Sequence, residues 1–224
     1  MHHIDLDSIV LASGGHQTRD QGVCLLEAVA WWAEEPHTDH PECVSKVLGG
    51  FGRSLNDVLP AARRQDLRPL IPLLPGTADD GRDETRGYLA LDWLIRTYTP
   101  AWLDLAGLTA EAAALRDFRR IADLAAAKAV RPHVEAARDK AYAAGAAAGD
   151  AAWDAARAAA GAAAGAGAAA WDAAGAAAGA AARAAAGAGA AAGAAAWAAL
   201  KPTVEQLQDS AITLYRTMIT AGAS

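Results

Sequence analysis

Apolar residues recur at helical spacing along much of this chain of 224 residues, and alternating strand-like runs are almost absent. The longest stripe starts at Val44 and continues 3, 4, 7, 11, 14 and 15 residues later, ending at Leu59. A second stripe runs from Val204 to Met218 at spacings of 3 and 4, so we expect this last segment to pack on the core. The pattern predicts an all-α fold with, at most, very short strands.

Capping residues and prolines predict where the helices begin and end. Thr18 and Gln21 form a capping-box pattern, which should introduce a helix over residues 24–35. Asp39 should cap the helix that carries the first stripe, with Pro41 in its first turn. The other expected helices lie at 82–98 with a kink or end at Pro100, from Thr109 onward, at 121–130 as far as Pro132, and after a capping box at Thr203 and Gln206.

Three glycines, Gly49, Gly50 and Gly52, interrupt the first stripe. Each costs about 1 kcal/mol in a helix interior relative to alanine. We therefore expect another backbone, or a ligand, to approach this helix closely.

Residues 141–199 form a tract of 40 Ala and 10 Gly. Trp153 and Trp171 lie 18 residues apart within a repeated Trp-Asp-Ala-Ala segment, which places them on one helical face. Glycine pairs at spacing four allow helix backbones to approach closely. We expect Ala-rich helices that dock on the rest of the molecule, with tryptophans as anchors. The predicted organisation is a core domain at 1–131, an Ala/Gly-rich helical region at 132–200 and a C-terminal helix at 201–224.

Charge and cysteine content narrow the functional classes. The formal net charge of −6 argues against a general nucleic-acid coat or a protein that binds anionic membranes. The N-terminus shows no secretory pattern, and no run is apolar enough to predict a membrane span. Two cysteines do not make a disulfide scaffold. The expected compartment is the cytoplasm.

Two polar clusters are candidate ligand sites. Glu27 lies among apolar residues of the first helix, and Arg53, Asn56 and Asp57 lie on the second. Glu27 either pairs with Arg53 to tie the two helices together or lines a pocket. The second cluster combines a stacking side chain with arginine forks that suit phosphate, and consists of Trp31, Arg63, Arg64 and Arg68. The alternative for this cluster is a solvated, charged surface.

A third cluster contains the ligand types of zinc, namely Cys24, His37, His40 and Cys43. Its spacing matches no standard zinc pattern. The alternative reading places Cys24 in the core, His40 near a helix start and His37 in solvent. We predict no cofactor, and zinc is the one metal that these residues suggest.

Several segments resemble one group of uncharacterised actinobacterial and actinophage proteins. The resemblance rests on Ser13-Gly-Gly-His16, Asp39-His40-Pro41-x-Cys43, Arg53-x-x-Asn56-Asp57, Pro100-Ala-Trp-Leu-Asp-Leu-Ala-Gly107 and the Trp-Asp-Ala-Ala tract. It implies a phage or actinobacterial setting and no established activity.

The sequence contains no recognisable catalytic motif, so the leading hypothesis is a non-catalytic binding protein that sequesters a small anionic or nucleotide-like molecule. One alternative is a metal-assisted enzyme built on the His/Cys cluster. The other is a structural protein whose Ala/Gly faces assemble. The expected partners are a small anion or a protein, with self-association and without nucleic acid or membrane.

Overall fold

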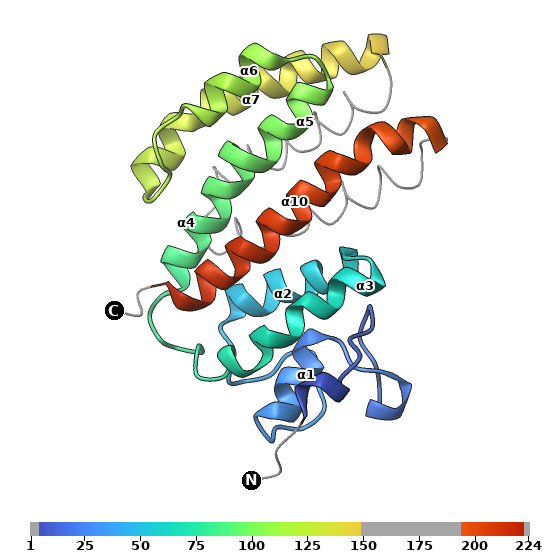
Figure 1. Cartoon of the computed structure of the whole chain (residues 1–224). Coiled ribbons are helices and arrows are strands. Elements are labelled where there is room, and N and C mark those ends of the chain that lie inside the picture. Colours follow the sequence, from blue (N-terminus) through green and yellow to red (C-terminus); the bar gives the residue numbers. More distant parts are fainter. Residues whose placement is uncertain (1–4, 149–193, 222–224) are drawn as a thin grey trace.

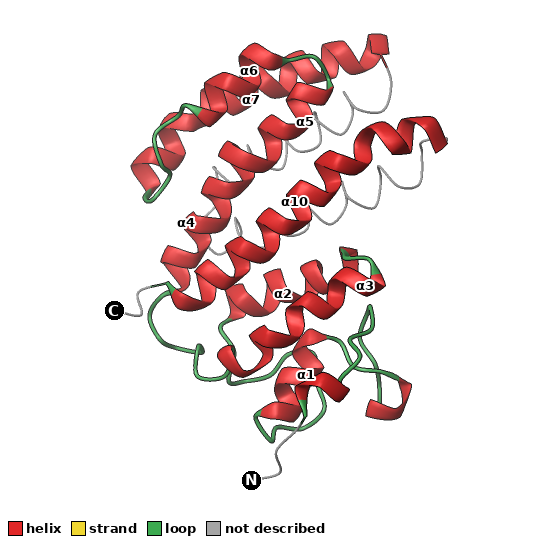
Figure 2. Ribbon diagram, in the orientation of Figure 1, coloured by secondary structure: helices red, strands yellow, loops and turns green. Residues whose placement is uncertain are grey.

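The computed structural model describes residues 5–148 and 194–221. Over these residues the chain is helical and contains no sheet, and the nearest approach to one is an isolated bridge between Leu11 and Val23 (Figure 2). The prediction of an all-α fold is confirmed.

The described elements vary from single turns to helices of more than six turns. In chain order they are η1 (Leu6–Ser8), η2 (Arg19–Gln21), α1 (Leu25–Trp32), α2 (Lys46–Val58), α3 (Ala61–Arg64), η3 (Gln65–Leu73), α4 (Asp83–Trp93), the π-helix η4 (Leu94–Tyr98), α5 (Thr99–Leu105), α6 (Thr109–Arg116), α7 (Leu124–Ala148) and α10 (Ala194–Thr220).

The last helix of the chain, α10, lies in the middle of the fold (Figure 1). It contacts α4 on one side, and α2 and η3 on the other. Beyond α4, the chain continues through η4 into α5. The helix α5 packs on α6, and α6 packs on α7. Beyond α2 lies α1, which also contacts η3. The fold is therefore closed by its C-terminal segment, and α10 joins the N-terminal helices to the α4–α7 layer.

The apolar stripe of α10 explains its central position. Val204, Leu207, Ala211, Leu214 and Met218 are all buried, as their spacing predicted. Burying each large side chain contributes about 1.5–3 kcal/mol. The prediction that this helix packs on the core is confirmed.

Tyr215 of α10 explains one of the glycines in α2. Its ring stacks on Phe51 with centroids 5.5 Å apart, and its hydroxyl donates to the carbonyl oxygen of Leu48 at 3.1 Å. A Cβ at Gly52 would lie 2.3 Å from that hydroxyl oxygen. The close approach expected at the three glycines therefore occurs at Gly52. The neighbour there is the side chain of Tyr215 and not another backbone or a ligand.

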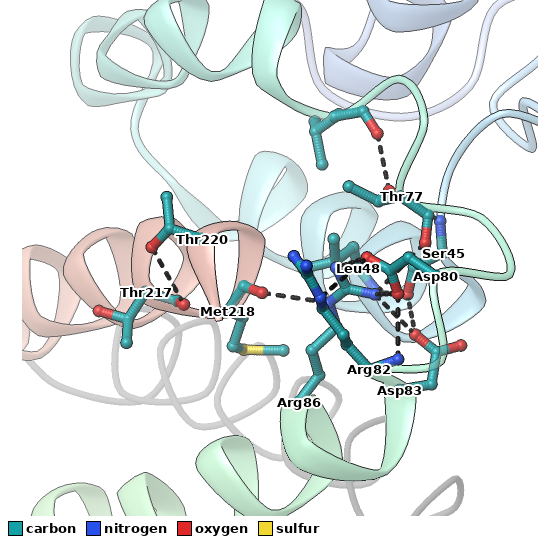
Figure 3. Close-up of polar contacts among 11 residues, drawn as sticks. Ser45, Leu48, Thr77, Asp80, Arg82, Asp83, Arg86, Thr217, Met218 and Thr220 are labelled. Carbon is teal, nitrogen blue, oxygen red and sulfur yellow. Dashed lines mark hydrogen bonds and ion pairs between the residues drawn. The ribbon is translucent and has the colours of Figure 1, made fainter. Parts of the chain in front are cut away.

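Arg86 of α4 forms a second connection to α10, drawn in Figure 3. Its side chain is completely buried and pairs with Asp80 at 2.6 Å and Asp83 at 3.1 Å. It also donates to the carbonyl oxygens of Thr77 and Met218. A buried guanidinium needs this degree of pairing, because its desolvation costs several kcal/mol. Burial opposes ionisation of Asp80, but the hydrogen bonds from Arg86 and from the backbone N–H of Arg82, together with the charges of both arginines, outweigh it and lower the pKa of that carboxyl.

One predicted cap and one predicted helix start are wrong. Thr18 makes no side-chain cap and precedes only the short η2, whereas α1 begins after Cys24. The stripe-bearing helix α2 begins after Ser45, whose hydroxyl accepts the N–H of Leu48, and not after Asp39. Residues between Asp39 and Ser45 are held as turns by Glu35, whose carboxylate accepts the N–H groups of Glu42 and Cys43.

Prolines end fewer helices than predicted. Pro100 lies in α5, and the π-helix η4 directly before it accommodates the missing N–H and the bulk of the ring. Pro132 lies inside α7, and Pro202 inside α10. An internal proline costs about 3 kcal/mol. In α7 the burial of apolar residues on both sides of Pro132, such as Val130 and Val134, offsets this cost.

The predicted boundaries at 131/132 and 200/201 fall inside α7 and α10, which are continuous there. Most of the Ala/Gly tract, including Trp153, Trp171 and their glycine pairs, lies outside the described residues. Among the described helices, none has the length and apolarity to span a bilayer.

Candidate functional site

Glu27 is the centre of a buried polar network at the start of α1. Its carboxylate accepts the N–H of Cys24 at 2.7 Å, as the third residue of the helix often does in a capping box. It also accepts the N–H of His16 at 2.5 Å and Nδ1–H of the same residue at 2.8 Å. Burial opposes ionisation, but these hydrogen bonds outweigh it and lower the pKa of Glu27. Glu27 is therefore a buried carboxylate that fixes the loop carrying His16.

His16 and Gly22 fit together in this network. Because the ionised carboxylate of Glu27 only accepts, Nδ1 of His16 carries the proton. Gly22 has φ of +137°, and a Cβ there would lie 2.8 Å from Nε2 of His16. Glycine at position 22 therefore supplies both the backbone conformation and the space for the imidazole.

His37 connects the next loop to the same network. Its Nε2 donates to the carbonyl oxygen of His16 at 2.9 Å and lies 3.8 Å from Glu27. Its buried Nδ1 has no hydrogen-bond partner in the described part of the chain. The alternative that placed His37 in solvent is wrong, because only 17% of its side chain is exposed.

Asn56 and Asp57 hold the N-terminal loop from the side of α2. Asn56 accepts the N–H of Leu25 at 3.1 Å and donates to the carbonyl oxygen of Ala12 at 2.9 Å. Asp57 accepts the N–H of Gly14 at 2.7 Å. Asn56 and Asp57 hold the same N-terminal loop that Glu27 contacts, but the expected pair between Glu27 and Arg53 does not form. Their main effect is to anchor the loop on α1 and α2.

The predicted arginine cluster is dispersed. Arg63 pairs with Asp66 and Asp209, while Arg64 is buried and donates to the carbonyl oxygens of Asn56 and Leu59. Arg68 donates to the carbonyl oxygens of Asp7 and Ile9. Trp31 stacks under the guanidinium of Arg19 at 4.8 Å. These residues therefore connect segments of the fold.

The candidate zinc ligands do not form a metal site among the described residues. No group of three or more His, Cys, Asp and Glu side chains is placed to hold a metal ion within the described ranges. His40 contacts Asp39 at 2.6 Å, whereas His37 contacts the carbonyl oxygen of His16. Both cysteines are free, and burial raises the pKa of each thiol to about 12, with Glu27 and Glu35 adding to the effect.

An open pocket of about 420 Å³ lies beside this network, at the start of α2. Its lining combines residues of both charges with apolar and small residues, which are His40, Pro41, Glu42, Val44, Ser45, Lys46, Gly49 and Arg53. Arg53 donates from Nη1 to the carbonyl oxygen of Asp39 at 2.9 Å. That bond joins the pocket to the loop that Glu27 and His37 hold in place.

Lys46 was missed by the sequence reasoning. It directly follows the Ser45 cap and is the first residue of α2. A helix start at Asp39 would place Lys46 in the second turn, away from the N-terminus of the helix. The available signal was Ser45, which is a good N-cap residue three positions before Leu48.

Comparison with known proteins assigns the chain to no family. The chain matches no protein-family model, no curated protein and no solved structure. The functional argument therefore rests on the geometry of the site.

Proposed function

We propose that this protein binds a small anion, without catalysis, in the pocket lined by His40, Lys46 and Arg53. The observation that carries the proposal is that Lys46 and Arg53 line one pocket, and neither makes an ion pair with a carboxylate among the described residues. In a chain of net charge −6, two unpaired cations at one pocket provide local complementarity to an anion.

The position of Lys46 supports the proposal. A cation in the first turn of a helix interacts unfavourably with the helix dipole, by about 0.3–1 kcal/mol. Lys46 is exposed and stands at the first position of α2, so helix stability does not account for it. An anion bound there would reverse the interaction, because helix N-termini and ammonium groups both attract negative charge.

His40 and Glu42 modulate the charge of the pocket. His40 contacts the carboxylate of Asp39 through Nδ1 at 2.6 Å. Glu42 is the only carboxylate in the lining, and it is exposed. The pocket should therefore favour anions of one or two charges at neutral pH, with weakening by salt.

The test is isothermal titration calorimetry of the full chain with inorganic phosphate at low ionic strength. We expect saturable binding that falls about tenfold in Lys46→Gln, because a hydrogen bond to a charged group contributes about 1.5–3 kcal/mol. The matched control is Lys128→Gln, which removes an exposed lysine of α7 outside the pocket. Equal affinities in the two variants, or no binding to the wild type, would refute the proposal.

Kinship with the actinobacterial and actinophage group, a cytoplasmic location and self-association through the Ala/Gly faces stay predictions.

A further inference from the structure

The pocket has an apolar wall as well as a cationic one. Pro41 and Val44 are largely buried yet line it, and Gly49 contributes backbone without a side chain. An inorganic oxyanion uses hydrogen-bond donors on every side and gains nothing from such a wall. At about 420 Å³, the pocket falls in the size range of small-molecule sites and exceeds what one oxyanion occupies.

We infer that the ligand is an organic anion, in which a phosphate or carboxylate head meets Lys46 and Arg53 while an apolar body packs on Pro41 and Val44. This inference rests on the proposed function, since it names the chemical class that the same pocket accepts. Burial of the body would add affinity in proportion to the apolar area removed from water.

Gly49 leaves the space for that body. A Cβ at this position would meet only Nη1 of Arg53, at 3.5 Å, which is an ordinary contact. Packing of the protein itself therefore does not require glycine here, although glycine weakens the helix relative to alanine. A methyl group at position 49 would enter the pocket without straining α2. The neighbouring Gly50 has nothing within 4 Å of its Cβ position and does not line the pocket.

The first experiment compares phenyl phosphate with inorganic phosphate by calorimetry on the full chain. Both carry a phosphate head, and only phenyl phosphate adds an apolar body. We expect phenyl phosphate to bind at least about tenfold more tightly, because a buried ring removes substantial apolar area from water. If the two bind equally, the inference is wrong while the proposed function stands. If neither binds, the proposed function fails first.

The second experiment uses Gly49→Ala with Gly50→Ala as its control. Both substitutions should raise the melting temperature, because alanine is the better helix former. Only Gly49→Ala should weaken phenyl phosphate, by about tenfold, since a poorly accommodated methyl group costs at least that much affinity. Its effect on inorganic phosphate should be smaller. If Gly49→Ala and Gly50→Ala bind phenyl phosphate equally well, the apolar body does not occupy this space and the inference is overturned.

Discussion

Replacing Gly52 by alanine should destabilise the fold, although the same change normally strengthens a helix. The added Cβ would lie 2.3 Å from the hydroxyl oxygen and 2.9 Å from Cζ of Tyr215, and 3.0 Å from a methyl carbon of Leu26. Tyr215 is completely buried between α10 and α2, so its ring has no open direction in which to move. The clash therefore disturbs the packing between α2 and α10.

The expected size follows from three contributions. Overpacking of a core contact costs about 1–3 kcal/mol. Displacement of Tyr215 also weakens its hydrogen bond to Leu48, which contributes about 1 kcal/mol. The higher helix propensity of alanine offsets about 1 kcal/mol of this loss. The net loss should be about 1–3 kcal/mol, with the steric contribution deciding the sign.

The assay is urea unfolding followed by circular dichroism, with Gly50→Ala as the reference. Position 50 is also inside α2, but its Cβ would meet nothing within 4 Å. That variant should gain up to about 1 kcal/mol, so the two neighbouring changes should have opposite signs. Adding Tyr215→Phe should cost less in the Gly52→Ala background than in the wild type, because it removes the nearest clashing atom. If Gly52→Ala is as stable as Gly50→Ala, α10 does not pack on α2 as described.

Two further predictions concern the network at the start of α1. Glu27→Gln should cost about 2–3 kcal/mol at pH 7, because it removes a charged acceptor from two N–H groups and an imidazole. The folded-state pKa of Glu27 is lowered, so this contribution is present above the unfolded pKa near 4.3 and is lost as the pH falls through the folded value. The difference in unfolding free energy between wild type and variant should therefore be smaller below pH 4 than at pH 7. A difference that stays constant would contradict this prediction. Cys24 and Cys43, whose pKa values are raised to about 12, should react with a thiol reagent at pH 8 far more slowly in folded than in unfolded protein, and rapid labelling of the folded chain would refute this.

Helical periodicity predicted the parts of the fold that depend on burial. The stripe from Val44 to Leu59, except for the half-buried Val58, and the one from Val204 to Met218 are buried as expected, because an amphipathic helix buries one face. Helix ends depended on distant residues. Glu35 takes the N–H groups of Glu42 and Cys43 and keeps that segment out of α2, and nothing in the local sequence near Asp39 reveals this.

The candidate site was predicted only in part, for a similar reason. The sequence placed Glu27 on the first helix and Asn56 and Asp57 on the second, but the partner of Glu27 is His16, which a loop brings to it. Periodicity carries no information on where a loop folds back. Arg53 was identified as a binding residue, whereas Lys46 could be recognised only once Ser45 was known to cap α2.

The most direct test of the account is a map of backbone amide chemical shifts during a phosphate titration at low salt. The pocket hypothesis predicts that the largest saturable changes fall on residues 40–49 and on Arg53, and that Lys46→Gln strongly reduces them at a phosphate concentration that half-saturates the wild type. Changes that centre on Arg63, Arg64 and Arg68, or weak changes spread over the whole surface, would contradict it.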